Sequence, residues 1–537
     1  MHNLARNLNP EYPATLGLSE GAVATAFAQA TEAALEILEA GGNAVDAAVA
    51  AAWALSVCEP SGSGLGGQTI LLVHLADGRI RVIDGHSHAP AAASPAVITK
   101  AQQRASYRAT TIPSTTATLS YAQRKYGRLP AARLLQPAIR LAEEGYRVTA
   151  LQHRQAVWVA AKLRATSACR LFLREGNPLR VGEIFRQPQL AATLRRLAVC
   201  GAEDFYLGGI ARLIAQDMQL NGGLVTEADL AHLALPVERE PISIEYRGHR
   251  IVTVPPPGGG AQILVALKLI EQLAPSDFGG NEEEWYETIA LACFGAFRER
   301  ERNARGPDGL TLSESNRYLS EERAQQIAAW LLAQRPIPRD EHRTEGPGDT
   351  THLSVVDRHG NVVALTQSIQ SLFGAKVAHP ALGFLYNNYL FTCPRYAHPY
   401  ALGSCALPRS NAAPTLVFRS SASGGGPLLA LGAAGSRRIT SSILQVLSSV
   451  IDRGMDVTDA VSAPRLHPLL SGKIWIEQPA ASSPLIAKLQ ARFPKVEIKA
   501  RHDFKMGSVQ AIQLLPAGRI LGTADPRRDG TAAIEAI

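Results

Sequence analysis

The residues of this chain best suited to chemistry lie in the run Asp349-Thr350-Thr351-His352. A threonine hydroxyl is a weak nucleophile unless a base takes its proton, and the α-amine of the same residue can serve as that base. The amine becomes free only when the peptide bond before the threonine is cut. The run therefore fits two interpretations: a cleavage site between Asp349 and Thr350 that exposes Thr350 as a nucleophile, or a strand that simply begins with β-branched residues.

A β-hairpin is predicted directly after this run, and it determines which side chains can reach Thr350. Short apolar, β-branched segments flank His359-Gly360, whose residue types favour a tight turn. A turn centred between these two residues places Ser368 opposite Thr351 and beside Thr350. A second hydroxyl group is therefore expected next to the candidate nucleophile.

Short motifs distributed over nearly the whole chain follow the order and spacing of one known pattern. They are Gly41-Gly42-Asn43-Ala44-Val45-Asp46-Ala47-Ala48, Leu65-Gly66-Gly67, Ala89-Pro90-Ala91, Tyr246-Arg247-Gly248, Pro255-Pro256-Pro257, Thr350-Thr351-His352, Phe373-Gly374, Asn387-Asn388, Pro414-Thr415, Gly435-Ser436-Arg437, Ala463-Pro464-Arg465 and Asp525-Pro526-Arg527. Through these motifs the chain resembles the γ-glutamyltranspeptidase family of N-terminal nucleophile hydrolases. Each motif alone is a weak signal, but their order and spacing are specific, and the resemblance favours a nucleophile at Thr350.

The resemblance implies an α+β fold, a four-layer αββα sandwich of the N-terminal nucleophile hydrolase type, which two segments of one cleaved precursor build together. The segments are residues 1–349 and residues 350–537. They are expected to remain together as a heterodimer, either alone or within a dimer of such heterodimers. The boundary is interpreted as a processing site rather than as a domain linker, and residues 306–348 are expected to form an exposed segment that opens after cleavage.

The family pattern also assigns roles to the residues of the reaction. Thr350 matches the nucleophile, and Ser368 occupies the position of a threonine whose hydroxyl orients the new α-amine. Ala434-Gly435 stands where a Gly-Gly pair supplies the backbone N–H groups of the oxyanion hole, which stabilise charge on the attacked carbonyl. Backbone donors survive a change from glycine to alanine, although the methyl group of Ala434 disfavours a positive φ.

Several positions that contact the glutamyl group in the family carry other residues here. His86 takes the place of the arginine that clamps the α-carboxylate, and an imidazole cannot make that permanently charged, two-pronged contact. Thr392 takes the place of the aspartate that binds the α-ammonium group. Losing both charge partners argues for a substrate other than an amino-acid zwitterion. At the remaining contact positions, Gln370 stands where the family has an asparagine and Tyr389 where it has a glutamine. Ser410 matches the family's serine, and Asn411 replaces the residue that follows this serine in the family.

These residues predict a self-cleaving amidohydrolase that acts through an acyl-enzyme, with no cofactor, on a small non-glutamyl amide such as oxamate. Three alternatives remain open at this point. They are a cephalosporin-acylase-like amidase, a γ-glutamyl hydrolase or transferase acting on glutathione or γ-glutamyl amides, and an uncleaved, non-catalytic binding protein.

Composition and charge argue against nucleic acid and membrane as partners. The chain has 537 residues, of which 46% are hydrophobic and 19% charged, and its formal charge is +7. The charges are scattered, and there is neither a basic stripe with interleaved aromatic residues nor a long apolar run. The alternation of Arg298, Arg300, Arg302 and Arg305 with Glu299 and Glu301 predicts a solvated helix face. The basic balance favours anionic substrates through the long-range field.

Location and metal binding are the last expectations from the sequence. The first residues lack the apolar stretch of a secretory signal, so a cytoplasmic protein is expected. The six cysteines show no metal-ligand spacing, although Cys393 and Cys405 could approach each other across a loop. His86 and His88 have the i, i+2 spacing of metal ligands, but no third ligand is evident, and no metal site is predicted.

Overall fold

The computed structural model describes residues 6–7, 20–232, 236–274, 276, 278, 280–303, 317–339, 348–420 and 425–535. Of the segment predicted to be exposed, residues 306–316 and 340–347 lie outside this part of the chain. Residues 321–333 form helix α14 (Glu321–Ala333), which buries Ala324, Ile327 and Leu331. For this stretch the prediction of an exposed segment is wrong, because the helix carries an apolar face that packs into the core.

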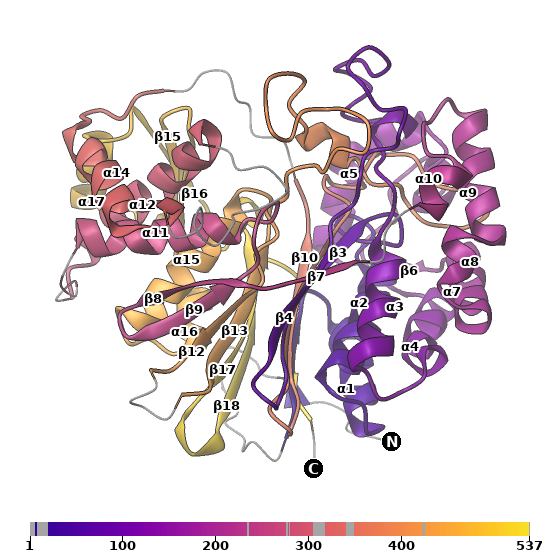
Figure 1. Ribbon diagram of the computed structural model, residues 1–537, viewed down its shortest axis with the longest axis horizontal. Coiled ribbons are helices and arrows are strands. Elements are labelled where there is room, and N and C mark those ends of the chain that lie inside the picture. The colour runs from indigo at the N-terminus through magenta and orange to yellow at the C-terminus, as the bar shows by residue number, and fades with distance from the viewer. Residues whose placement is uncertain are drawn as a thin grey trace.

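Two β-sheets form the centre of the molecule (Figure 1). The eight-stranded sheet has the order β1 (Arg6–Asn7), β19 (Thr531–Ile534), β2 (Ala22–Thr25), β10 (Thr351–Val356), β11 (Val362–Ser368), β3 (Gln68–His74), β4 (Ile80–Gly85) and β7 (Val237–Arg239). The six-stranded sheet has the order β18 (Ile520–Ala524), β17 (Ser508–Leu514), β13 (Pro427–Ala434), β12 (Thr415–Phe418), β9 (His249–Thr253) and β8 (Ile242–Tyr246). Both sheets take strands from either side of residue 350.

Helices cover the outer face of each sheet (Figure 1). Against the eight-stranded sheet lie α1 (Ala28–Glu39), α2 (Ala44–Cys58) and α3 (Thr115–Tyr126), and α4 (Ala131–Glu144) packs on α2 and α7 (Pro188–Cys200). The other helices of this half are α5 (Ala150–Arg164), α6 (Cys169–Phe172), α8 (Glu203–Tyr206), α9 (Gly209–Leu220) and α10 (Glu227–Ala231). On the other side lie α11 (Gly260–Leu273), α12 (Glu282–Arg302), α14, α15 (Arg438–Ile451), α16 (Val457–Ser462) and α17 (Ser483–Gln490). A three-stranded sheet, β14 (Leu466–Pro468), β15 (Lys473–Glu477) and β16 (Lys495–Lys499), and the pair β5 (Tyr146–Arg147) and β6 (Ile184–Phe185) are peripheral.

Strand alternation explains why the layers stack in this order. In β3, Ile70 and Leu72 point into an apolar layer shared with the six-stranded sheet. Their neighbours Leu71 and Val73 point the opposite way, into the core formed with α1 and α2. A strand that is apolar on both faces must be covered on both sides. The four-layer αββα sandwich implied by the resemblance is confirmed.

The hairpin that follows Thr350 forms as predicted, but its register differs by one residue. Thr351 pairs with Gln367, and the last pair before the turn is Val356 with Val362. The turn is centred on His359, because the N–H of Asp357 donates to the carbonyl of Asn361 at 3.1 Å. The prediction that Ser368 faces Thr351 is therefore wrong, and the register continues to Thr350 opposite Ser368.

Candidate active site

Two hydroxyl groups meet at the peptide bond that the sequence predicts to be cut. Thr350 is buried just before β10, and its Oγ1 lies 2.6 Å from the carbonyl oxygen of Asp349 and 3.2 Å from Oγ of Ser368. Ser368 Oγ donates to the same carbonyl oxygen at 2.9 Å. The arrangement places the Thr350 hydroxyl beside the carbonyl it would attack, while Ser368 polarises that carbonyl.

Tyr389 links this pair to other predicted contact positions. It begins the short 3-10 helix η2 (Tyr389–Thr392), and its hydroxyl interacts with Ser368, Gln68 and Ser410. Burial raises the pKa of the Tyr389 phenol well above its usual value, so the group is neutral and can donate a hydrogen bond. Gln370 also reaches Ser368, since its backbone N–H donates to Oγ at 2.9 Å. Ser368 is thus held from several sides.

The candidate oxyanion turn follows β13. Gly435 has φ +122° and Ser436 has φ +59°, whereas Ala434 is not among the residues of positive φ in the described chain. The methyl group of Ala434 therefore meets no backbone strain, because the conformation that favours glycine is taken by Gly435. Gly348 lies against this turn, where a Cβ atom would come within 2.4 Å of Cβ of Ser436. The chain that leads to Thr350 thus passes close to Ala434-Gly435-Ser436.

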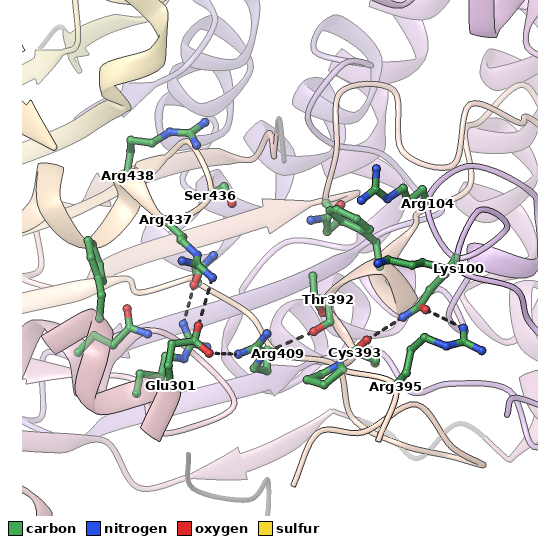
Figure 2. A pocket seen from close by; sticks show the side chains of 18 residues that line it. Lys100, Arg104, Glu301, Thr392, Cys393, Arg395, Arg409, Ser436, Arg437 and Arg438 are labelled. Carbon is green, nitrogen blue, oxygen red and sulfur yellow. Dashed lines mark hydrogen bonds and ion pairs between the residues drawn. The ribbon is translucent and has the colours of Figure 1, made fainter. Parts of the chain in front are cut away.

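Beside this turn lies a cavity of about 490 Å³ whose charged side chains are mostly cationic (Figure 2). Three predicted contact residues line it, Gln370, Thr392 and Asn411, together with Ser436. Seven lining side chains are cationic and one is acidic. The cations are Lys100, Arg104, Arg300, Arg395, Arg409, Arg437 and Arg438, and the carboxylate is Glu301.

The acidic group of this cavity is already neutralised. Glu301 pairs with Arg409 at 3.0 Å and with Arg437 at 3.1 Å, as Figure 2 shows. Arg300 donates to Asn411 Oδ1 at 2.6 Å and to the carbonyl of Ser410 at 2.6 Å. Burial, and then neighbouring arginines, lower the pKa values of Arg300 and Arg409 to about 10, so both remain charged at neutral pH. A net positive cavity results.

The prediction of a solvated face on α12 is therefore wrong for all its described residues except Arg302, which is exposed. Arg300 and Glu301 turn into the cavity, and Glu299 is buried in an ion pair of 2.7 Å with Arg323. Arg298 stacks 3.6 Å above the ring centroid of Trp330, and Arg305 lies outside the described residues. Alternating charges on one helix look the same in sequence whether they face water or a polar cavity.

The cavity lining includes none of the other predicted site residues, which are His86, Asp349, Thr350, Ser368, Tyr389, Ser410, Ala434 and Gly435. His86 Nδ1 lies 2.5 Å from Oδ1 of Asp84, which also pairs with Arg239 at 3.0 Å. Burial opposes ionisation of Asp84, yet His86 and Arg239 together hold the pKa of its carboxyl group well below its usual value. His86 is thus part of a buried charge cluster whose other members the sequence did not single out.

The described residues contain no cluster of three or more His, Cys, Asp or Glu side chains suited to a metal ion. Cys393 and Cys405 are both free thiols, the first buried and the second exposed. Within the part of the chain that the structure covers, no helix is both long and apolar enough to span a bilayer.

Comparison with known proteins finds similarity along nearly the whole chain. The family model described as Gamma-glutamyltranspeptidase matches residues 30–535. The chain is 34% identical over 538 aligned positions to a glutathione hydrolase proenzyme of Escherichia coli (strain K12), covering 95% of this chain and 90% of the relative. It is 33% identical to an acylase ACY 1 proenzyme of Pseudomonas sp. (strain SE83), covering 96% and 93%.

Among solved structures, a cephalosporin acylase from Bacillus halodurans superimposes with a TM-score of 0.87 at 28% identity, covering 99% of both chains. A γ-glutamyltranspeptidase from Helicobacter pylori matches with a TM-score of 0.52 at 30% identity, covering 56% of this chain and 89% of that one. The similarity therefore extends to proteins named for two different substrates.

Proposed function

Because the chain belongs to the γ-glutamyltranspeptidase family of N-terminal nucleophile hydrolases, we propose that it is a self-processing amidohydrolase whose substrates carry a carboxylate, but no ammonium group, on the acyl part. Family membership establishes a hydrolase or transferase fold and chemistry. The observation that carries the choice of substrate is the cavity lined by seven cations and one carboxylate.

Maturation would begin with attack of Thr350 Oγ1 on the carbonyl carbon of Asp349. The C–N bond breaks as the ester forms, and the hydroxyl proton ends on the amine of Thr350. Water then hydrolyses the ester, which leaves a carboxylate on Asp349 and a free α-amine on Thr350. The contacts of 2.6 Å and 2.9 Å from Thr350 and Ser368 to the Asp349 carbonyl support this step. The products would be segments 1–349 and 350–537, held together as a heterodimer.

In turnover the Thr350 hydroxyl would again be the nucleophile, and the newly exposed α-amine of Thr350 would be its base. The α-amine takes the proton of Thr350 Oγ1, the oxygen attacks the amide carbonyl, and the amine returns the proton to the leaving nitrogen. The backbone N–H groups of Ala434 and Gly435 would hold the oxyanion. Water then attacks the acyl-enzyme and releases the acid, so that each cycle consumes one water molecule.

Charge separates the candidate substrates. A γ-glutamyl group brings a carboxylate and an ammonium group into the cavity, and a buried charge without a partner costs several kcal/mol. The carboxylate finds arginines, whereas the ammonium group finds Thr392 in place of an aspartate and Glu301 already paired with two arginines. A monoamide of a dicarboxylic acid carries a carboxylate but no ammonium group.

Cavity size refines the expectation of oxamate as substrate. Oxamate has the required carboxylate, but its few atoms would fill little of a cavity of about 490 Å³. A longer chain between carboxylate and amide would be needed to reach from the cations to Thr350, which is not among the residues that line the cavity. A cephalosporin acylase is among the structures this chain resembles, which agrees with a larger acyl amide. We therefore place oxamate at the small end of a series rather than at its optimum.

The test uses two anilides that differ only in the ammonium group. Purified, matured protein is assayed with glutaryl 4-nitroanilide and with γ-glutamyl 4-nitroanilide, and kcat/KM is compared. We expect the glutaryl compound to be preferred by about tenfold or more, which corresponds to about 1.4 kcal/mol. Preference for the γ-glutamyl compound would replace the proposal with glutathione hydrolysis. No turnover of either, with an intact chain, would favour a binding protein.

A further inference from the structure

A buried charge cluster surrounds Asp349, the residue before the predicted cleavage site. Arg528 follows the Asp525-Pro526-Arg527 motif, and its Nη2 lies 2.5 Å from Asp349 Oδ1. Its Nη1 lies 3.2 Å from Glu59 Oε1. All three side chains are almost inaccessible, with exposed fractions of 1% for Arg528, 0% for Asp349 and 2% for Glu59.

Arg528 touches both sides of the bond between Asp349 and Thr350. Besides its contact with the Asp349 carboxylate, Nη1 donates to the carbonyl oxygen of Thr350 at 3.1 Å. The Thr350 N–H donates to Asp349 Oδ1 at 2.9 Å, which closes a ring of contacts around the bond. A guanidinium group suits this task because its donors are fixed in one plane and can serve two acceptors together.

The second oxygen of Asp349 is fixed independently. Gln155 Nε2 donates to Oδ2 at 3.3 Å, and Ser61 Oγ donates to the other end of the same amide at 2.9 Å. The backbone N–H of Asp349 donates to the carbonyl of Gln370 at 2.8 Å. The side chain and backbone of this residue are therefore both held, although Asp349 supplies neither of the hydroxyl groups of the reaction.

We infer that Asp349 and Arg528 are positioning residues for self-cleavage: the ion pair holds the Asp349 carbonyl at the Thr350 hydroxyl, and Glu59 limits how firmly Arg528 can hold it. This inference rests on the proposed self-processing at Thr350. It adds residues that act through Thr350 and Ser368 and that leave the acyl pocket untouched.

The protonation of Glu59 gives the cluster its pH dependence. Burial raises the pKa of Glu59 to about 8, with Asp349 adding to the rise and Arg528 opposing it. Other groups facing Glu59 are the Asp529 carboxyl, whose pKa burial also raises, and the buried, neutral Cys58 thiol and Tyr146 phenol.

Well below this pKa Glu59 is mostly protonated and neutral, so Asp349 is the main charge partner of Arg528. Above pH 8 Glu59 ionises and competes with Asp349 for the same guanidinium group. The Asp349 carbonyl should then be held less firmly at the Thr350 hydroxyl, and self-cleavage should be slower.

The experiment follows cleavage of freshly purified full-length chain by intact mass at pH 6.5 to 9. Asp349→Asn keeps the shape of the side chain and removes a charge that raises the pKa of Glu59, so Glu59 can ionise, pair with Arg528 and retain the fold; we expect cleavage about tenfold slower or more. Arg528→Met should be slower still, and Arg528→Lys should recover part of the rate. Glu59→Gln should match the native chain near pH 7 and exceed it increasingly above pH 8.

The control for general destabilisation is Arg465→Met, because Arg465 forms an equally buried pair of 2.7 Å with Asp525 but makes no contact with Asp349 in the described structure. Native cleavage rates in Asp349→Asn and Arg528→Met would overturn the inference. A slowing that merely follows the loss of Tm, as in Arg465→Met, would also overturn it. Failure of the native chain to cleave before Thr350 would instead overturn the proposed function.

Discussion

Two charged regions lie close to Thr350, and they differ in how their charges are balanced. Around Asp349, one arginine stands between two carboxyl groups, and every partner is buried. The neighbouring cavity is lined by seven cations and one carboxylate, and the two arginines that pair with this carboxylate, Arg409 and Arg437, retain exposed fractions of 17% and 23%. The charges of the first region are nearly balanced without a ligand, whereas the second has an excess of positive charge that can bind an anionic ligand.

The difference follows from the cost of burying charge. A fully buried ion is tolerated only with a partner, so the cluster at Asp349 must be satisfied by the protein itself. Cations at the wall of an open cavity keep contact with water and can exchange it for a substrate carboxylate. One region is therefore suited to holding the chain in place for a single event, and the other to binding and releasing a substrate repeatedly.

The largest effect should come from removing the nucleophile that both regions serve. Thr350→Ala deletes the hydroxyl that attacks Asp349 and later the substrate, so neither cleavage nor turnover should be detectable. Intact mass and the N-terminal sequence of the smaller fragment check the first, and anilide release checks the second. A variant that still cleaves before residue 350 would show that another group attacks this bond.

Ser368→Ala should have the next largest effect. It removes the hydroxyl that donates at 2.9 Å to the Asp349 carbonyl and that stands 3.2 Å from the nucleophile. We expect cleavage to slow by about one to several orders of magnitude, because misplacing the groups of proton transfer has that cost. Ser368→Thr is the matched control, since it keeps the hydroxyl, and it should cleave at a rate near the native one. Equal rates in both variants would exclude this role.

A carboxylate placed in the cavity should weaken its preference for substrates without an ammonium group. Thr392→Asp restores an acidic group at the predicted ammonium position, where the side chain of Thr392 now donates to the carbonyl of Tyr389 at 2.9 Å. We expect the ratio of kcat/KM for glutaryl over γ-glutamyl 4-nitroanilide to fall about tenfold. Thr392→Asn, which has the same shape without the charge, should leave the ratio nearly unchanged. If both variants change it equally, shape rather than charge determines the preference.

The sequence predicted the parts of this site that depend on local pattern. Alternating apolar residues determine the strands, and the turn residues near His359 determine the hairpin, so Thr350 and Ser368 were placed together within one residue of the observed register. The error of one residue arose because a longer turn, closed by Asp357 and Asn361, is centred differently from a tight one.

What the sequence could not predict are contacts between distant segments. Arg528 and Glu59 are 469 positions apart, and Arg300 meets Asn411 across 111 positions. No local pattern distinguishes these side chains from surface charges. For the same reason the sequence does not predict the contact between His86 and Asp84, which lies in a buried cluster. An arginine introduced there would meet that carboxylate first, so Thr392→Asp alone is the cleaner test.

Ionic strength should produce the smallest effect and separate the two regions most directly. The Debye length is about 8 Å at 0.15 M salt, so charges near water are screened while fully buried pairs are screened much less. Raising sodium chloride from low to high concentration should increase KM for glutaryl 4-nitroanilide a few-fold, because all of the cavity cations except Arg438 are at least partly exposed. The rate constant of self-cleavage should change less, since Asp349 and Arg528 are excluded from solvent. Butyryl 4-nitroanilide, which has no acyl charge, corrects for general effects of salt on the enzyme. A cleavage rate as sensitive to salt as KM would mean that the Asp349 cluster opens to water before the bond is cut, and the contrast between the two regions would then hold only for the resting chain.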